Sequence, residues 1–434
     1  MKKVISYILL VLVSTMLHAQ EKLSLQQAVS IGLEKNLNIK ISEKAVEQTT
    51  NDYEKSVGAF LPQVSITAGK SFSNTNVRQQ FVNDDSPREI NGAKSNTLDV
   101  SPNLRWTIFN GLGMFHTRDR IAETMGLAED DLKIQIENTI AQISTAYYRL
   151  VLEKERLRVL EEALKLSADR VELAKTRYEV GKTSKLDYLQ AQVDYNADQS
   201  NVLNQKEVVF NAQVDLNRLM GTGLDAQYET DANFSANESL QIESLLASAQ
   251  LNNPGLLRAQ RNREIAYLQS KEIGAERFPQ LSLNFGYNFN DRNSDAGFLI
   301  SNTSKGINYG ITASWNILNG FDVKRRMQNA QIQIETRELE IENMKLQLES
   351  DLRKAFINYQ NSIALRALEE QNFSIAEENY DIALERYKLG NATPLEIREA
   401  QINFVQAELR KIQASFSVKV QEIELNRLAG NNLQ

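Results

Sequence analysis

The segment Arg177-Tyr178-Glu179-Val180-Gly181 recurs 209 positions later as Arg386-Tyr387-Lys388-Leu389-Gly390. Outward from it, the same offset relates Trp106 and Asn110-Gly111 to Trp315 and Asn319-Gly320, and Leu216-Asn217-Arg218-Leu219 to Leu425-Asn426-Arg427-Leu428. No insertion or deletion has changed this spacing across 106–221 and 315–430. Because loops tolerate such changes and long packed helices do not, we predict a tandem duplication with two rigid helical hairpins, 111–220 and 320–429.

Each hairpin is predicted to begin with one very long helix, over 113–180 in the first repeat and 322–389 in the second. At ~1.5 Å per residue such a helix is about 100 Å long. Apolar residues follow seven-residue steps on one seam that includes Leu166 and Leu173 and their counterparts Ile375 and Ile382. A second seam carries Ile334, Ile341 and Leu348. Two seams on a helix indicate neighbours on both sides, as in a curved wall of helices. A plain antiparallel bundle is the alternative.

Glycines and capping residues mark the far end of each hairpin. Gly181 and Gly390 are predicted to end the long helices as C-cap glycines. After each, Ser184-x-x-Asp187 and Thr393-Pro394-x-Glu396 are typical of capping boxes that start the returning helices.

A pair of strands is expected before each hairpin, at 61–108 and 279–318. Apolar and polar residues alternate there, as Leu283, Phe285 and Tyr287 do with Asn284 and Gly286, and in the last strand the alternation runs to Ile317. The polar faces are nearly free of charge, and the apolar faces carry aromatic residues. This pattern favours a membrane β-barrel, apolar toward lipid and polar toward a wet lumen, over a sheet on a soluble core. The stretches around 74–95 and 291–305 are predicted as loops.

Trp106 and Trp315 each lie four residues before an Asn-Gly pair, at the predicted change from strand to helix. That position suits an aromatic girdle at a membrane interface. Four strands cannot close a barrel, because the smallest membrane barrels use about eight. The missing strands must come from other copies of the chain, and the strand count alone does not separate a dimer from a trimer.

Shorter helices are predicted at 20–60 and 239–277, with breaks at Asn36-Leu37 and Asn253-Pro254. Each is followed by a proline, Pro62 or Pro279, which fits a sharp change from helix to strand. Residues 221–238 are expected to link the two repeats, and 430–434 form a C-terminal tail.

The composition of the 434-residue chain excludes several kinds of chemistry. There is no cysteine, and the two histidines are His18 and His116. Disulfides, thiolate metal sites and a lipid-modified N-terminal cysteine are therefore excluded, and nucleophilic, general-base or zinc chemistry is poorly supported. We expect no catalytic residue, no metal site and no cofactor. A net charge of −7 argues against nucleic acid as a partner.

The N-terminus is typical of a secretory signal peptide over residues 1–19. Lys2 and Lys3 precede a short apolar run, and Ala19-Gln20 is the expected cleavage junction. The apolar run is too short to span a bilayer.

These residues together resemble the TolC-like outer membrane efflux protein family, over essentially the whole chain after the signal segment. The strongest matches run from Arg177 through Gln192 and from Arg386 through Gln401. The Asn-Gly pairs and the Pro-Gln pairs at 62–63 and 279–280 also fit. The resemblance implies a mixed α and β membrane protein of the cell outer membrane. It implies a homotrimer whose 12-stranded β-barrel, four strands per chain, sits in the lipid and continues into a long periplasmic α-helical barrel.

The same resemblance implies a passive channel-tunnel of a tripartite efflux or type I secretion system, supplied by an inner-membrane transporter through a periplasmic adaptor. It implies a periplasmic gate at Asp187, Glu396 and Glu399, linked by Tyr178 and Tyr387. The adaptor would dock on the tips, at Gly181, Gly390, Arg177 and Arg386. The chain departs from the family pattern at Ala392, where an Arg is expected, and at Asn36-Leu37, which lacks a common proline.

Other readings stay open at this point. Helix capping is an alternative sole role for Asp187 and Glu396, and a solvated helix face is the alternative for Glu399. A long periplasmic coiled-coil scaffold without transport activity would explain the helices but not the four lipid-type strands. An enzyme that uses only carboxylates has no supporting residues.

Overall fold

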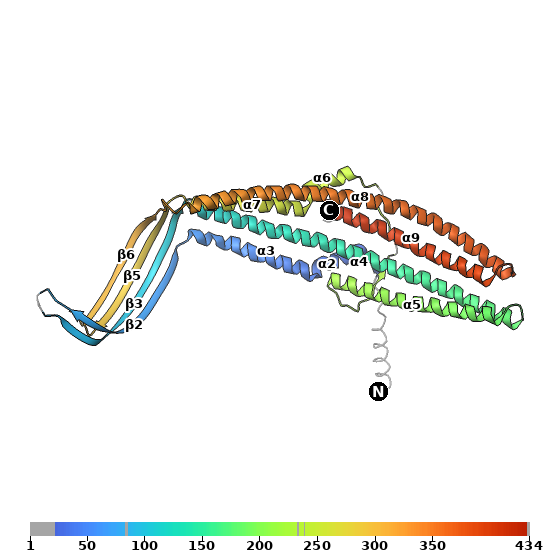
Figure 1. Ribbon diagram of the computed structural model, residues 1–434, viewed down its shortest axis with the longest axis horizontal. Coiled ribbons are helices and arrows are strands. Elements are labelled where there is room, and N and C mark those ends of the chain that lie inside the picture. Colours follow the sequence, from blue (N-terminus) through green and yellow to red (C-terminus); the bar gives the residue numbers. More distant parts are fainter. Residues whose placement is uncertain (1–21, 83–85, 232–233, 238, 432–434) are drawn as a thin grey trace, which may run out of the picture. The chain divides into compact units, whose positions relative to one another are not determined.

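The computed structural model describes residues 22–82, 86–231, 234–237 and 239–431 (Figure 1). The expected signal segment, 1–19, lies outside the described residues. The chain divides into two compact units. One holds the described residues of 1–45, 129–258 and 341–434, and the other holds 46–128 and 259–340. Of the helices in the described residues, none is both long enough and apolar enough to cross a membrane.

The second unit contains a four-stranded antiparallel sheet in the order β2-β3-β5-β6 (Figure 1). The strands are β2 (Gln63–Gln79), β3 (Arg88–Asn110), β5 (Gln280–Ser294) and β6 (Ser301–Ser314). Each repeat supplies one strand hairpin, and β3 pairs with β5 to join the two repeats. The sheet is open, with β2 and β6 at its edges. The four strands expected from the alternating pattern are thus present.

Three features of the strands differ from expectation. The loop expected at 291–305 is shorter, because β5 runs to Ser294 and β6 begins at Ser301. Strands β2 and β3 pair as far as Gln79 and Arg88, so most of the loop expected at 74–95 is strand. Backbone pairing does not require alternating side chains, which is why the polar sequence there hides it. At the other end, β6 stops at Ser314 instead of continuing to Ile317. Ser314 pairs with Gln280, and the next residue on that partner strand is Pro279, which has no N–H to donate.

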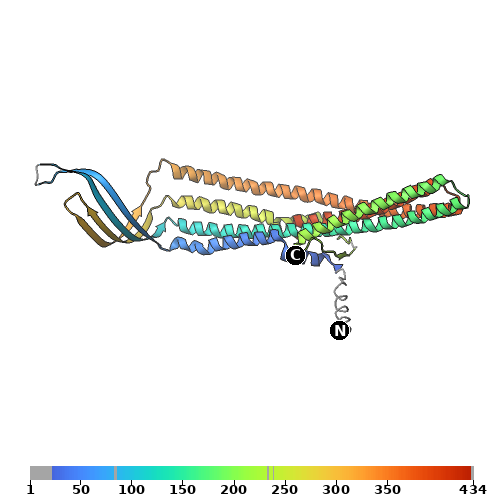
Figure 2. The ribbon, with the colours of Figure 1, turned by 90° about the horizontal axis from the view of Figure 1, so that it is seen from below.

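Two long helical hairpins follow the strand pairs (Figure 2). Their helices are α4 (Gly113–Glu179) with α5 (Lys185–Met220), and α8 (Asp322–Leu389) with α9 (Pro394–Ala429). The shorter elements are α2 (Leu25–Lys35), α3 (Leu37–Lys55), η1 (Ser56–Phe60), α6 (Ile242–Asn252), α7 (Pro254–Ala275), and a parallel pair of β1 (Lys22–Leu23) and β4 (Glu229–Thr230).

The first unit has two related hydrophobic cores. In one, Ala28 on α2 packs with Ile143, Leu216 and Met220 on the first hairpin. In the other, α6 packs in the same way on the second hairpin, and its core residues include Leu245, Leu352, Leu425 and Ala429. The duplication seen in the sequence is therefore also a duplication of packing.

The breaks in the short helices have one cause in both repeats. The Asn36 side chain donates to the Leu219 carbonyl at 2.7 Å, and its oxygen accepts from the Asn38 amide at 2.8 Å. Asn253 does the same, donating to the Leu428 carbonyl at 3.0 Å and accepting from the Leu256 amide at 3.0 Å. Each asparagine starts the next helix and ties it to a hairpin, so no proline is needed at Asn36.

Candidate functional site

The tips of the two hairpins have nearly the same backbone. At the first, Gly181 has φ +72°, its amide donates to the Tyr178 carbonyl at 3.0 Å, and the next amide donates to the Arg177 carbonyl at 2.8 Å. At the second, Gly390 has φ +83° and the corresponding bonds reach Tyr387 and Arg386 at 3.0 and 2.8 Å. Both turns are Schellman motifs, which favour glycine at the left-handed position. The tip residues predicted from the sequence therefore end helices.

Asp187 is held inside the first tip. Ser184 is the N-cap of α5 and forms a complete capping box with it. The Asp187 carboxylate accepts from the Thr183 hydroxyl at 2.6 Å and from the Ser184 hydroxyl at 2.9 Å. These bonds, the one from Thr183 foremost, lower the pKa of Asp187 below its usual value. The carboxylate is therefore charged and fixed at neutral pH.

The second tip is built differently. Thr393 caps α9 by accepting from the Glu396 amide at 3.2 Å, and Pro394 occupies the first turn. The expectation of a full capping box is wrong here, because the Glu396 carboxylate lies 4.0 Å from the Arg386 guanidinium instead of returning to the Thr393 amide. Glu396 and Glu399 are both exposed. In a single chain, Asp187 belongs to the first tip, and Glu396 and Glu399 belong to the second.

Arg177 joins the two tips. From the end of α4 it donates to the carbonyls of Tyr387 and Lys388, the latter at 3.1 Å, and so caps the C-terminus of α8. Its guanidinium also lies 4.5 Å from the centre of the Tyr387 ring. Tyr387 is buried in a small core with Ile397 and Ala400, and Ala392 packs against that core.

Tyr178, the counterpart of Tyr387, has different surroundings. It is exposed, and its ring stacks against Tyr188 with the ring centres 6.2 Å apart. Arg386, the counterpart of Arg177, donates to the Asn391 carbonyl of its own turn at 3.1 Å. The structure thus brings Arg177 and Tyr387 together and leaves Arg386 and Tyr178 apart.

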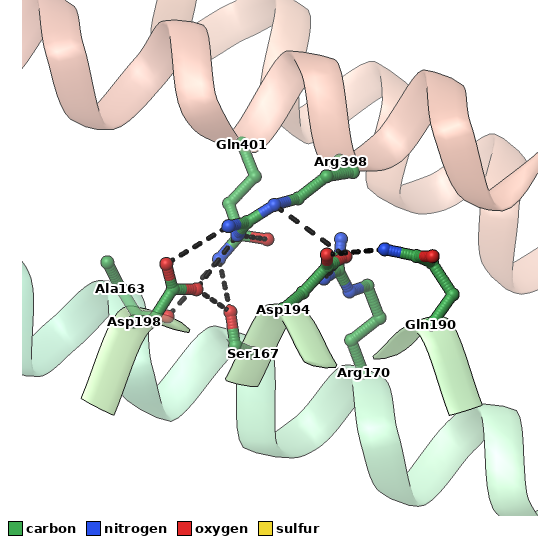
Figure 3. Close-up of polar contacts among 8 residues, drawn as sticks. All are labelled: Ala163, Ser167, Arg170, Gln190, Asp194, Asp198, Arg398 and Gln401. Carbon is green, nitrogen blue, oxygen red and sulfur yellow. Dashed lines mark hydrogen bonds and ion pairs between the residues drawn. The ribbon is translucent and has the colours of Figure 1, made fainter. Parts of the chain in front are cut away.

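A largely buried charged cluster, which was not predicted from the sequence, joins the first hairpin to α9. Figure 3 shows Arg398 and Gln401 reaching from α9 toward α4 and α5. Arg398 forms two bonds to the Asp198 carboxylate, at 2.8 and 3.0 Å, and its Nε lies 3.7 Å from Asp194. Asp194 also pairs with Arg170 at 2.6 Å. Arg170 is buried, and burial lowers its pKa more than Asp194 raises it.

Neutral partners complete this cluster. Gln401 donates to the Ala163 carbonyl at 3.2 Å and to the Ser167 hydroxyl at 2.9 Å, and Ser167 donates to Asp198. One residue of the cluster, Arg170, could have indicated it in the sequence. Arg170 lies between Leu166 and Leu173 on an apolar seam, where a charged side chain needs a partner. Apolar periodicity alone does not reveal it.

The two tryptophans tie strands to helices within the second unit. Trp106 Nε1 donates to the Phe60 carbonyl at 2.8 Å, and Trp315 Nε1 donates to the Arg277 carbonyl at 3.0 Å. Each acceptor lies two residues before the proline that precedes the first strand of the same repeat. Both indole rings are also exposed, so each has an apolar face free for another role.

A model of the family described as outer membrane efflux protein matches residues 28–222 and 245–431. The chain belongs to this family. The resemblance drawn from the repeated segments is confirmed, and the matched ranges contain both tips and the charged cluster. The search of curated proteins found no match.

Solved structures show the same fold as this outer membrane efflux protein. The CmeC outer membrane channel of Campylobacter jejuni has a TM-score of 0.78 at 16% identity, covering 94% of this chain and 86% of that one. The outer membrane protein VceC of Vibrio cholerae has a TM-score of 0.75 at 16% identity, covering 94% and 96%. The open state of the MtrE outer membrane channel of Neisseria gonorrhoeae has a TM-score of 0.72 at 14% identity, covering 94% and 89%.

The chain thus belongs to a family of outer membrane efflux proteins, which are not enzymes, and it shares the fold of solved outer membrane channels. The tip residues, the charged cluster and the exposed tryptophans are its candidate functional residues.

Proposed function

We propose that this chain forms a homotrimeric channel-tunnel, with a 12-stranded barrel in the outer membrane and a periplasmic helical barrel. It would passively conduct cargo from an inner-membrane transporter and a periplasmic adaptor to the exterior. The observation that carries the proposal is the uncovered sheet. Val64 and Ile66 on β2, and Ile307 and Ile311 on β6, are between 63% and 72% exposed. An apolar sheet face that no helix of the described residues covers suits lipid, and open edges suit further strands.

The uncovered sheet also weighs against the alternative of a soluble coiled-coil scaffold, which has no use for lipid-type strands. Trp106 and Trp315 would lie at the membrane interface of the barrel. The tips, with Gly181, Gly390, Arg177 and Arg386, would receive the adaptor. Efflux of small molecules and secretion of polypeptides both fit this design.

Oligomeric mass and membrane location test the proposal. The protein extracted from outer membranes with detergent is expected to have the mass of three chains by light scattering. It should not be released from the membrane fraction by high salt or alkali. A monodisperse monomer with its full strand content, or release without detergent, would contradict the proposal.

In the proposed trimer, three copies each of Asp187, Glu396 and Glu399 would surround the periplasmic opening. A ring of carboxylates focuses a negative potential that attracts cations. We therefore expect a cation-selective channel that divalent cations block from the periplasmic side. Glu396→Gln combined with Glu399→Gln should shift the reversal potential toward zero in a salt gradient across a planar bilayer, and should weaken the block.

The matched control is Glu335→Gln with Glu342→Gln, which removes two exposed carboxylates on α8 far from the tip. It should leave selectivity and block unchanged. Asp187 is left intact because its capping bonds would confuse folding with gating. If the tip variant keeps the native reversal potential and block, the gate does not consist of these glutamates.

A further inference from the structure

One face of the four-stranded sheet is apolar over several rows of side chains. The pairing of the strands sets these rows, as it does for Phe285 with Tyr309. On β5 the apolar residues extend from Leu281 to Phe289, which is eight steps of ~3.4 Å, or about 27 Å along the strand. The usual barrel tilt of ~40° reduces this to a height of about 20 Å, comparable to the ~25 Å apolar band of membrane barrels. We call the alternating apolar residues within 64–68, 98–104, 281–289 and 307–313 the apolar belt.

The apolar belt ends at a lysine on three of the four strands. Along each strand, in the direction away from the helices, we looked for the first charged residue on this face beyond the belt. It is Lys70 on β2, Lys94 on β3 and Lys305 on β6, whereas on β5 it is Asp291. Lys70 and Asp291 lie in one row of the sheet, and Lys305 lies in the next row, opposite Phe289. The lysines therefore follow the limit of the belt.

These lysines are placed to meet an anion. All three are exposed, and among the described residues none of them forms an ion pair. The Lys70 ammonium lies 5.4 Å from the centre of the Phe72 ring, which is exposed too. Asp291 accepts from the Thr303 hydroxyl at 2.6 Å. Three lysines and one aspartate give this limit a formal charge of +2, on a chain whose net charge is −7. The surface is thus locally basic on an acidic protein.

Protection of sheet edges is a simpler explanation for two of the lysines. Edge strands often carry lysine because its charge discourages unwanted pairing, and β2 and β6 are the edges of this sheet (Figure 1). This role does not explain Lys94 on the central strand β3, nor the position of each lysine where the belt ends. At such a limit the stem of a lysine covers apolar surface while its ammonium reaches the level of the lipid headgroups.

The two edge lysines come together when the sheets of neighbouring copies join. In the proposed barrel, β6 of one copy pairs with β2 of the next. The apolar belts of all copies are matched to the same lipid layer, so they lie level around the barrel. Lys305 of one copy and Lys70 of the next copy then lie near each other, just beyond the belt. Like charges on neighbouring strands are destabilising, so an anion between them stabilises the junction.

We propose that Lys305 of one copy and Lys70 of the next copy bind the phosphate groups of a glycolipid in the outer leaflet. The inference rests on the proposed function, whose periplasmic helices place the lysine end of the sheet toward the exterior. Two ammonium groups match a headgroup with at least two negative charges, and a phosphomonoester carries about −1.5 to −2 at pH 7. A phosphodiester lipid carries one. Lys94 is not part of the site, because the Asp295 carboxylate lies 3.3 Å from its amide nitrogen and places a negative charge nearby.

Lipid binding to the purified protein tests the site. The protein in a neutral detergent is titrated with lipid A that carries two phosphates, with phosphatidylglycerol and with phosphatidylcholine. Native mass spectrometry counts the bound lipids and gives the mass of the oligomer. We expect lipid A to bind about tenfold more tightly than phosphatidylcholine, the effect of one or two charge-assisted hydrogen bonds. Lys70→Gln with Lys305→Gln should remove most of this preference, and Lys70→Arg with Lys305→Arg, which keeps both charges, should retain it.

The matched control is Lys165→Gln with Lys345→Gln, which removes two exposed lysines from the long helices and should leave lipid binding unchanged. If the glutamine variant of Lys70 and Lys305 is trimeric and binds lipid A as the native protein does, the site is overturned and the trimer stands. Equal binding of phosphatidylcholine by the native protein has the same meaning. Phosphatidylglycerol bound as tightly as lipid A overturns the choice of a glycolipid phosphate. A monomeric mass for the native protein overturns both the site and the proposed function.

Discussion

Arg398→Ala is expected to lower the free energy of unfolding by about 3–5 kcal/mol, the usual cost of removing one partner from a buried ion pair. Asp194 and Asp198 are only 16% and 12% exposed, so water replaces little of the lost guanidinium. Asp198 would keep only the Ser167 hydroxyl among the bonds described above. The measurement is denaturant unfolding in detergent, followed by the circular dichroism of the helices.

Arg158→Ala is the matched control. Arg158 also contacts three carboxylates, on Glu155, Glu162 and Glu408, but its side chain is 47% exposed. Exposed pairs contribute about 0–1 kcal/mol. Of these three partners only Glu408, at 12% exposed, is as buried as Asp198, so this variant should lose clearly less stability than Arg398→Ala. Equal losses for the two variants would show that burial does not set the strength of these pairs.

A double variant tests the cause more closely. Arg398→Leu with Asp198→Ala gives these positions the residues Leu189 and Ala407 that the other repeat carries. Because no buried charge then lacks its partner, the double variant should be more stable than Arg398→Ala. A larger loss in the double variant would mean that the pair itself stabilises the contact between α5 and α9.

The helices could be predicted from the sequence because their ends are marked locally. Helix α8 spans Asp322–Leu389, the predicted range, since Gly390 stops it and no proline interrupts it. Helix α4 ends at Glu179, close to its C-cap Gly181. The helix break at Asn36 was also predicted from the sequence. Its cause, a hydrogen bond from Asn36 to the distant Leu219 carbonyl, was not predicted.

The features that could not be predicted depend on contacts between residues far apart in the sequence. Strands β2 and β3 extend beyond Asn74 through backbone pairing. This pairing needs no alternation of apolar and polar side chains, so the sequence does not indicate it. The charged cluster needs α4, α5 and α9 together, with Asp198 and Arg398 separated by 200 positions. Glu396 matches a capping motif, but the nearby Arg386 guanidinium competes for its carboxylate. Local sequence patterns were therefore enough to predict the helices and strands. The arrangement of the candidate functional residues depends on contacts between these elements, which the local patterns do not show.

Gly111→Ala is expected to destabilise the protein by about 2–5 kcal/mol, from left-handed strain and overpacking together. Gly111 has φ +68° where β3 gives way to α4. A β-carbon there would lie 2.3 Å from the Ala275 carbonyl oxygen and 2.9 Å from the Phe278 β-carbon. The first of these is backbone at the end of α7, which cannot move without disturbing the turn that leads into β5.

Gly181→Ala separates the two causes. Its φ of +72° is nearly the same, but a β-carbon there would meet no atom within 4 Å. It should therefore cost only the left-handed strain of about 1–2 kcal/mol. Thermal unfolding of both variants in detergent, together with the amount of oligomer recovered from the membrane, gives the comparison. If both variants lose the same stability, backbone conformation alone requires glycine at position 111. If Gly111→Ala loses more, the close approach of α7 also fixes the angle at which the strand enters the helix.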